Sequence, residues 1–283
     1  MKSQIFILYL LMMSVMGSVM LEDPDIEDSL FELAWQEDFD QDSLDLEVWT
    51  TSVGDGCPDL CGFGNNELQY YSEDNENIRI EDGVLIIEAH KQKRGSSDYT
   101  SGKILTRSKL EWKWGRIDVR AKLPVGRGTW PAIWMLPTIN GREMKWPEDG
   151  EIDIMEHVGY NHGMVYGTIH TKKYNGMLGT HKFDSVYVAD AHENFHTYSI
   201  KWTEDYISWL KDDVEYFNLQ KGNDDLDGWP FNQNKFHLII NLAVGGNWGG
   251  RYGVDDDIWP QKLMVDYIKY YKLKNNNQEF KTK

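Results

Sequence analysis

Cysteine and basic residues are both scarce in this sequence. Only two cysteines occur among the 283 residues, Cys57 and Cys61 in the segment CPDLC. A zinc site would need two more ligands at suitable spacing and none stands nearby, so the pair is expected to form a local disulfide or to stay as free thiols. The 46 acidic residues outnumber the 29 lysines and arginines, which gives a formal net charge of −17. This charge argues against nucleic acid as a partner and favours a neutral substrate.

The N-terminus carries an apolar run that is short for a membrane span. One lysine precedes the run at residues 5–16, and Gly17 and Ser18 follow it. This layout is typical of a secretory signal peptide; a single N-terminal anchor helix is the alternative. We expect residues 1–20 to be a signal peptide cleaved near 17–20, with no membrane contact afterwards. The mature protein is then expected to be secreted or periplasmic.

No long segment has the period of a helix. Short alternating segments instead predict strands at 83–91, 115–124, 150–158, 163–171, 196–202, 206–212, 236–244 and 263–273. Turn-forming clusters separate these strands, and neither a composition break nor an internal repeat marks a second domain. We therefore expect an all-β jelly-roll sandwich of two antiparallel sheets over residues 31–273. An acidic segment, 21–30, precedes this domain and a polar tail, 274–283, follows it.

Aromatic residues are abundant, with 12 tryptophans and 15 tyrosines. Such side chains either fill a core or stack on the apolar faces of sugars in an exposed groove. Composition alone does not choose between these two uses.

Three carboxylates stand within six residues in the segment GEIDIMEHV. Glu151 and Asp153 alternate with isoleucines, so on a strand they share the face opposite the core. Glu156 falls on the wrong face unless Met155 forms a β-bulge, which returns it to the face of the first two acids. A helix does not work, because five residues at 100° each turn Glu156 by about 140° from Glu151.

Three acids on one face of a partly buried strand cannot all ionise freely, so the pKa of at least one rises. An ionised carboxylate beside a protonated one is the pair that cleaves glycosidic bonds, and close spacing corresponds to the retaining mechanism. A solvated acidic strand face or a cation site is the alternative.

The segment GEIDIMEHVG resembles the catalytic motif of glycoside hydrolase family 16 in its laminarinase form. Other blocks agree in order: WQEDFD, NNELQYY, GRIDVRAKLP, GTWPAIWMLP, GTIHT, FHTYSIKWT and INLAVGGNWGG. The resemblance implies a concave substrate cleft, Glu151 as nucleophile, Glu156 as general acid/base, and Asp153 as the residue that tunes the nucleophile. It implies a retaining endo-1,3-β-glucanase acting on a neutral laminarin-type glucan, as a monomer that needs no cofactor for catalysis.

The inserted Met155 separates this motif from the shorter form found in lichenases. Agarases and carrageenases share the longer form, so a marine galactan or a mixed-linkage 1,3-1,4-glucan is the alternative substrate. A non-catalytic glucan-binding protein on the same fold is a further alternative, although such relatives typically lose the glutamates. Transglycosylation uses the same intermediate.

The resemblance also implies substrate-binding residues around the acids. Trp130 and Trp134 are four apart, so they share a strand face and are expected beneath the sugars, with core packing as the alternative. Trp248 stands in a glycine-rich loop and is expected to stack on sugar. The other expected contacts are made by His170, Asn66 and Arg79.

Many family members bind one calcium ion away from the active site. The matching positions are Asp38, the carbonyl oxygen of Gly83, and Asp266. Two carboxylates and a carbonyl are hard oxygen ligands suited to Ca²⁺. Two surface acids without a metal are the alternative.

One motif points to different chemistry. The segment HENFH at 192–196 matches the H-E-x-x-H signature of zinc proteases, which requires a helix. Here the motif leads directly into an alternating strand pattern, so we expect no zinc site.

Overall fold

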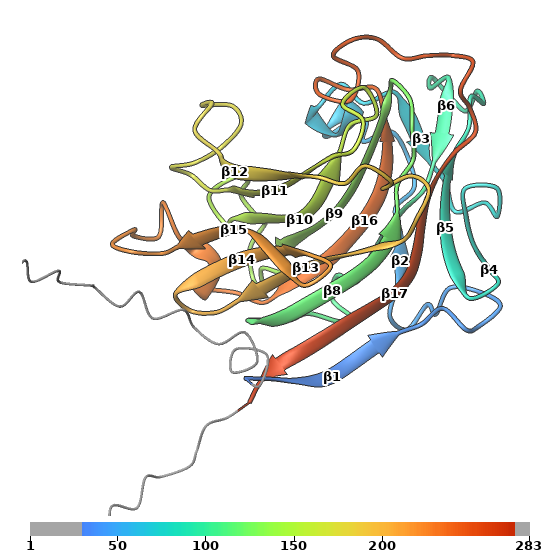
Figure 1. The fold of residues 1–283 in the computed structure, drawn as a ribbon. Helices are drawn as coiled ribbons and strands as arrows, with labels where there is room; N and C mark the ends of the chain where they lie inside the picture. Colours follow the sequence, from blue (N-terminus) through green and yellow to red (C-terminus); the bar gives the residue numbers. More distant parts are fainter. Residues whose placement is uncertain (1–29, 275–283) are drawn as a thin grey trace, which may run out of the picture. The chain divides into compact units, whose positions relative to one another are not determined.

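The alternating segments of the chain pair into two antiparallel sheets that pack face to face (Figure 1). The computed structural model describes residues 30–274. The expected signal peptide, nearly all of the acidic segment and most of the polar tail lie outside the described residues. Within them, no helix is both long and apolar enough to cross a membrane.

The first sheet has eight strands in the order β15-β14-β13-β8-β17-β5-β4, with β1 also paired to β17. The strands are β1 (Phe31–Glu37), β4 (Ile78–Glu81), β5 (Val84–Ala89), β8 (Gly115–Lys122), β13 (His196–Trp202), β14 (Tyr206–Lys211), β15 (Val214–Gln220) and β17 (Gln261–Leu273).

The second sheet has seven strands in the order β12-β11-β10-β9-β16-β7-β2. They are β2 (Thr50–Thr51), β7 (Lys103–Leu105), β9 (Thr129–Pro137), β10 (Glu151–His157), β11 (Met164–His170), β12 (Lys182–Tyr187) and β16 (Phe236–Val244). A small parallel pair, β3 (Gln69–Tyr71) with β6 (Tyr99–Ser101), and two short 3₁₀ turns, η1 (Cys61–Gly64) and η2 (Pro230–Asn232), complete the fold.

The core lies between the two large sheets because one face of each strand is apolar. On β16, for example, Phe236, Leu238 and Ile240 are fully buried and point into this core. His237 and Asn241 alternate with them and so point to the opposite face of the same sheet. The seven-stranded sheet therefore has one face in the core and one face away from it.

The eight predicted strands are all present, each within two residues of its expected bounds. The alternation was a weaker signal for the edge strands β12 and β15, whose residues are mostly half-buried or exposed on both faces. The abundant tryptophans serve both expected purposes: Trp49, Trp202 and Trp209 are fully buried in the core, whereas others lie at the acids described below.

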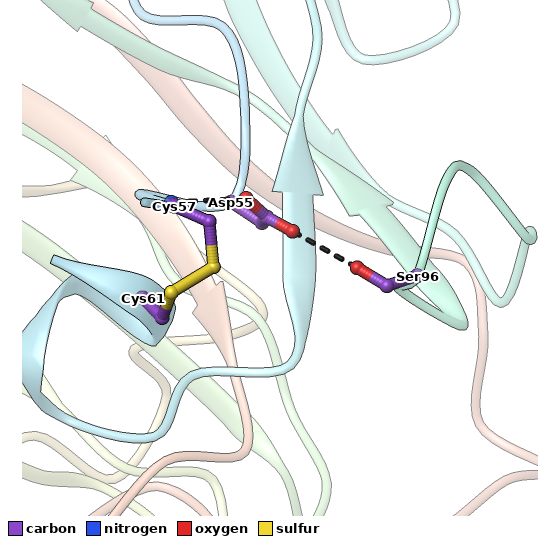
Figure 2. The surroundings of a disulfide bond; sticks show 4 residues. All are labelled: Asp55, Cys57, Cys61 and Ser96. Carbon is purple, nitrogen blue, oxygen red and sulfur yellow. Dashed lines mark hydrogen bonds between the residues drawn. A yellow bond between two sulfur atoms is a disulfide. The ribbon is translucent and has the colours of Figure 1, made fainter. Parts of the chain in front are cut away.

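The two cysteines form a disulfide, Cys57–Cys61, which settles the choice that the sequence left open (Figure 2). Asp55 stands beside it and accepts hydrogen bonds from the backbone N–H of Cys57 at 3.1 Å and the hydroxyl of Ser96 at 3.0 Å. These hydrogen bonds lower the pKa of Asp55. The loop is thus tied both to itself and to the turn before β6.

The zinc-protease motif does not form a helix. His192 lies in a turn, while His196 is the first residue of β13. The His196 ring contacts Asp212 at 2.8 Å and Asp190 at 3.1 Å instead of facing His192 across a helical turn. The helix that the zinc-protease motif requires is therefore absent from this segment.

Candidate active site

The strand register confirms a bulge in β10 between Asp153 and Glu156. Asp153 lies opposite Thr168 of β11, but Glu156 lies opposite Tyr166, so β10 has one more residue than its partner. The same shift appears against β9. Ile154 and Met155 are both buried in the core, so two consecutive residues share one core-facing position. Glu156 therefore returns to the face that carries the first two acids, which we call the active-site face.

Burial is the main electrostatic feature of the three acids. Desolvation raises the pKa of Glu151 and of Glu156 to about 7, and the charge of Glu156 adds to the effect on Glu151. The pKa of Asp153 is raised well above its usual value, first by desolvation and then by the charges of the two glutamates. Near neutral pH this cluster therefore retains protons that exposed carboxylates would lose.

Glu151 has the donors that favour its ionised form. The indole Nε1–H of Trp146 donates a hydrogen bond to Oε2 of Glu151 at 2.8 Å, and this bond lowers the pKa of the carboxyl. A hydrogen bond from Asp153 lowers it further. Glu156 receives one such bond, from Trp130. Of the two glutamates, Glu151 is thus the better suited to be ionised while Glu156 holds the proton.

Asp153 is held beneath Glu151 and His170. No N–H or hydroxyl donor reaches its buried Oδ2, and Nε2 of His170 is 3.5 Å away. When protonated, the Asp153 carboxyl donates a hydrogen bond to Glu151. Burial lowers the pKa of His170 to about 4, so the imidazole is neutral here. Trp209 fixes the strand from the core side by donating its Nε1–H to the carbonyl of Asp153 at 2.7 Å.

Among the described residues, Glu151, Asp153 and His170 are also the one group of three His, Cys, Asp or Glu side chains close enough together to hold a metal ion. One ligand atom each of Glu151, Asp153 and His170 lies within 4.8 Å of the others. Two of the three, Glu151 and Asp153, also belong to the hydrogen-bonded network described above, in which Trp146 and Asp153 donate to Glu151.

Glu156 is surrounded by aromatic side chains. Trp130 of β9 donates its Nε1–H to Oε1 of Glu156 at 3.0 Å. The ring of Trp248 stands edge-on to Trp130 at 5.6 Å and to Tyr166 at 5.2 Å between centroids. Trp130 and Trp248 were both predicted at the site, and the structure brings them together beside the acid. Tyr166, which lies opposite Glu156 on β11, was not predicted.

Trp134 lies on the same face, one strand from Asp153. Its Nε1–H donates to Asn241 of β16 at 2.7 Å, and the ammonium of Lys103 stands 5.2 Å from its ring centroid. Lys103 is enclosed, and burial lowers its pKa while the charges of Glu67 and Glu151 oppose that change. Lys103, Glu67 and Trp146 are site residues that the sequence did not reveal. Only the third stands near the acid motif in the chain.

Asn66 lies at the loop that carries Trp248. Its side-chain amide donates to Oδ1 of Asn247 at 2.8 Å. A Cβ on Gly246 would lie 3.1 Å from both the carbonyl oxygen of Asn65 and the ring of Trp130. With its positive φ of 76°, this glycine lets the two loops and the tryptophan meet closely. Asn66 is therefore placed beside the predicted stacking residues.

The prediction that Arg79 contacts substrate beside the acids is corrected by its position in the fold. It lies on β4, at the edge of the eight-stranded sheet, and neighbouring Ile78 points into the core. Arg79 consequently points away from the core on the far side of the sandwich from the acids. Its guanidinium binds Glu81 and Glu88, each at 2.6 Å, beside a separate hollow of about 610 Å³. The sequence block was recognisable, but a motif does not reveal which sheet a strand joins.

The three predicted calcium ligands lie on or next to paired strands: Asp266 is on β17, Asp38 follows β1 and Gly83 precedes β5. Residue 37 of β1 pairs with Ile268 and Leu85 of β5 pairs with Val265, on the same side of β17. Asp266 lies between these two paired positions and has no partner in the strand register. Asp38 and Gly83 therefore flank Asp266 in the sheet. The Asp266 carboxylate, however, also binds Arg120, and Gln36 donates to Asp38 at 2.7 Å.

Comparisons with known proteins agree with this geometry. The model of the family described as glycosyl hydrolases family 16 matches residues 65–269. The chain is 48% identical over 250 residues to a beta-glucanase of Rhodothermus marinus, covering 86% of this chain and 85% of that one. The chain belongs to glycosyl hydrolases family 16.

Two solved laminarinase structures show the same fold. The laminarinase from Rhodothermus marinus superposes with a TM-score of 0.81 at 45% identity, covering 86% of this chain and 98% of that one. A laminarinase from Flavobacterium sp. UMI-01 gives a TM-score of 0.78 at 41% identity, covering 85% and 100%. The jelly-roll sandwich predicted from the strand pattern is thereby confirmed, and the chain is a glycosidase of family 16.

Proposed function

We propose that this protein is a retaining endo-1,3-β-glucanase that hydrolyses laminarin-type glucan. The observation that carries the proposal is the β10 bulge, which puts Glu151 and Glu156 on one face with raised pKa values. The family 16 relatives support the substrate: one is named a beta-glucanase and another, from Niallia circulans and 37% identical over 266 residues, a glucan endo-1,3-beta-glucosidase. The latter is longer, and this chain covers 38% of it.

In the proposed reaction, protonated Glu156 donates its proton to the glycosidic oxygen as that bond breaks. Ionised Glu151 attacks the anomeric carbon from the opposite side of the sugar, which forms a glycosyl ester on Glu151. Glu156, now ionised, removes a proton from water, and the water oxygen displaces Glu151 with retention of configuration. Asp153 keeps its proton throughout and donates it to Glu151 as a hydrogen bond, which limits the cost of the buried charge.

Product analysis on four polymers side by side tests the substrate. Purified protein is incubated with laminarin, lichenan, agarose and carrageenan, and reducing ends and oligosaccharide products are measured. We expect 1,3-linked gluco-oligosaccharides from laminarin and no release from the two galactans. The strongly negative charge of the protein disfavours sulfated carrageenan. Agarose is neutral, so the expectation for it rests instead on the relatives named beta-glucanase and glucan endo-1,3-beta-glucosidase. Binding to laminarin without hydrolysis would contradict the proposal and favour a glucan-binding protein.

We propose that Asp38, Asp266 and the carbonyl oxygen of Gly83 hold a calcium ion that stabilises the fold without entering catalysis. Two carboxylates and a carbonyl are hard oxygen ligands that suit Ca²⁺, and the pairing of β1 and β5 with the same side of β17 supports the proposal. Arg120 competes for Asp266, so affinity is expected to be modest. A thermal shift measured with calcium and with a chelator tests this: calcium should raise the Tm of the native protein but not that of Asp266→Asn. Equal shifts in both would refute the site.

We propose further that the protein is exported and acts as a monomer. The N-terminal sequence supports export, and the disulfide of Cys57 and Cys61 suits an oxidising compartment. N-terminal sequencing of the mature protein tests the cleavage near residues 17–20. Light scattering coupled to size-exclusion chromatography tests the monomer.

A further inference from the structure

The active-site face continues beyond the acids to the edge of the seven-stranded sheet. Asp153 of β10 lies opposite Thr168 of β11, and Thr168 lies opposite Phe183 of β12. Opposite residues of an antiparallel pair point to the same face, so Phe183 shares the face of the acids. Val186, on the alternate positions of β12, packs against the core instead. Two strand spacings put Phe183 about 10 Å from Asp153 across the sheet.

Aromatic and imidazole rings fill this part of the face. The rings of His170 and His181 are nearly parallel, with 21° between planes and 5.6 Å between centroids. His181 and Phe183 follow at 18° and 4.9 Å. Burial lowers the pKa of His181, so its imidazole is neutral near pH 7. A row of uncharged rings therefore leads from the catalytic centre to the sheet edge.

The loop between β11 and β12 fixes this row. The side-chain amide of buried Asn175 donates to the carbonyl oxygens of Thr171 at 3.1 Å and Lys172 at 3.2 Å. The backbone N–H of Gly176 donates to Nδ1 of His170 at 3.2 Å. These bonds tie the loop to His170, and the chain returns so that His181 lies beside it.

Phe183 remains 50% exposed at the end of this fixed row. A single exposed aromatic residue needs no explanation by itself. Here, however, it shares a transverse line with Trp134 and Asp153, in a chain whose proposed ligand is a polymer with apolar sugar faces.

From this alignment we infer that Phe183 and His181 form an outer subsite that binds a pyranose ring of the glucan beyond the sugars at the acids. Phe183 supplies the stacking surface and His181 holds its ring in place. The inference rests on the proposed function. Such a subsite makes the enzyme favour long glucan chains over short ones. Because the subsite lies two strands from β10, only substrates long enough to cross β11 reach it.

Kinetics on 1,3-linked gluco-oligosaccharides of increasing length test the subsite. We expect Phe183→Ala to raise KM for laminarin and long oligosaccharides about 3- to 10-fold, the loss of one ring contact, with kcat nearly unchanged. For the shortest oligosaccharide that is cleaved, kcat/KM should match the native enzyme. Phe183→Trp should restore the preference for long chains.

Tyr187→Ala is the matched control. Tyr187 is 63% exposed on the same face of β12, but it pairs with Met164 and lies four residues from Phe183, off the line of the acids. It should not change length dependence. If Phe183→Ala behaves like the native enzyme at every length, or loses activity equally at every length, the subsite is refuted. Failure of the native enzyme to cleave laminarin would instead refute the proposed function, and the subsite with it.

Discussion

Trp130 donates its indole N–H to Glu156 at 3.0 Å, from the neighbouring strand β9. Trp146 does the same for Glu151 at 2.8 Å, from the loop before β10. Each glutamate thus has its own indole donor, and each bond lowers the pKa of the glutamate it reaches. The two acids need opposite protonation states. Removing the donor to Glu156 should therefore move the alkaline limb of the kcat/KM profile against pH, and removing the donor to Glu151 should move its acid limb.

Trp130→Phe removes the donor to Glu156 but keeps an aromatic ring. The pKa of Glu156 should rise, so the general acid keeps its proton to higher pH. We expect the alkaline limb of the kcat/KM profile to move up by about half to one pH unit, while the acid limb stays in place. Activity measured on laminarin from pH 4 to 10 checks this. A shift of the alkaline limb to lower pH would contradict the role assigned to Glu156.

Trp146→Phe removes the donor to Glu151. The pKa of Glu151 should rise, so the nucleophile is protonated at higher pH than in the native enzyme. The acid limb is expected to move up by a similar amount and the optimum to narrow. Trp146 is 39% exposed, so the substitution should leave the fold intact. An unchanged acid limb would show that Glu151 is not the group whose ionisation starts the reaction.

Glu156→Gln should stabilise the protein at pH 8 and leave its stability unchanged at pH 4. The folded pKa of Glu156 is raised to about 7, above the value near 4.3 of an exposed glutamate. Its contribution is therefore fully present below about pH 4 and is lost as pH rises through 7. The expected gain at pH 8 is on the order of 2 kcal/mol, or about 5 °C in Tm. Equal Tm differences at both pH values would count against a buried charge.

Deleting Met155 should remove the bulge and turn Glu156 toward the core unless β10 changes register. We expect kcat/KM to fall by about a thousandfold or more, since the general acid is displaced. Met155→Ala is the control, because it keeps the residue count and so the bulge. It should lower stability by about 2–5 kcal/mol through a core cavity yet retain most of kcat. Equal losses of kcat in both variants would contradict the bulge as the cause.

Local patterns carried most of the fold prediction. Alternation placed β13 and β16 at their observed bounds, because each has one face that is mainly apolar. Several strands were not among the predicted ranges, β1, β4 and β9 included. Two of them, the edge strands β12 and β15, have no consistently apolar face to mark them. The bulge was predictable from the spacing of the acids. With a strand period of two, Glu151 and Asp153 share a face, and Glu156 joins them only if one extra residue is accommodated between Asp153 and Glu156.

The partners of the acids were harder to predict because they come from distant segments. Lys103 reaches Glu151 only after β7, β16 and β9 have paired side by side. Trp146 stands five residues before Glu151, yet only the loop's return brings its N–H to the carboxylate. Arg79 failed for the same reason, since its neighbours in the chain did not reveal that β4 joins the other sheet.

Chemical rescue of Glu151→Ser is the most direct test of the central claim that Glu151 is the nucleophile and Glu156 the acid/base on one strand face. The variant should lose nearly all hydrolysis with its fold intact. Azide with an activated β-glucoside substrate should then restore turnover and yield an α-glycosyl azide, because the small anion occupies the vacated side of the sugar. A β-glycosyl azide from this variant would contradict the account by exchanging the roles of the two glutamates.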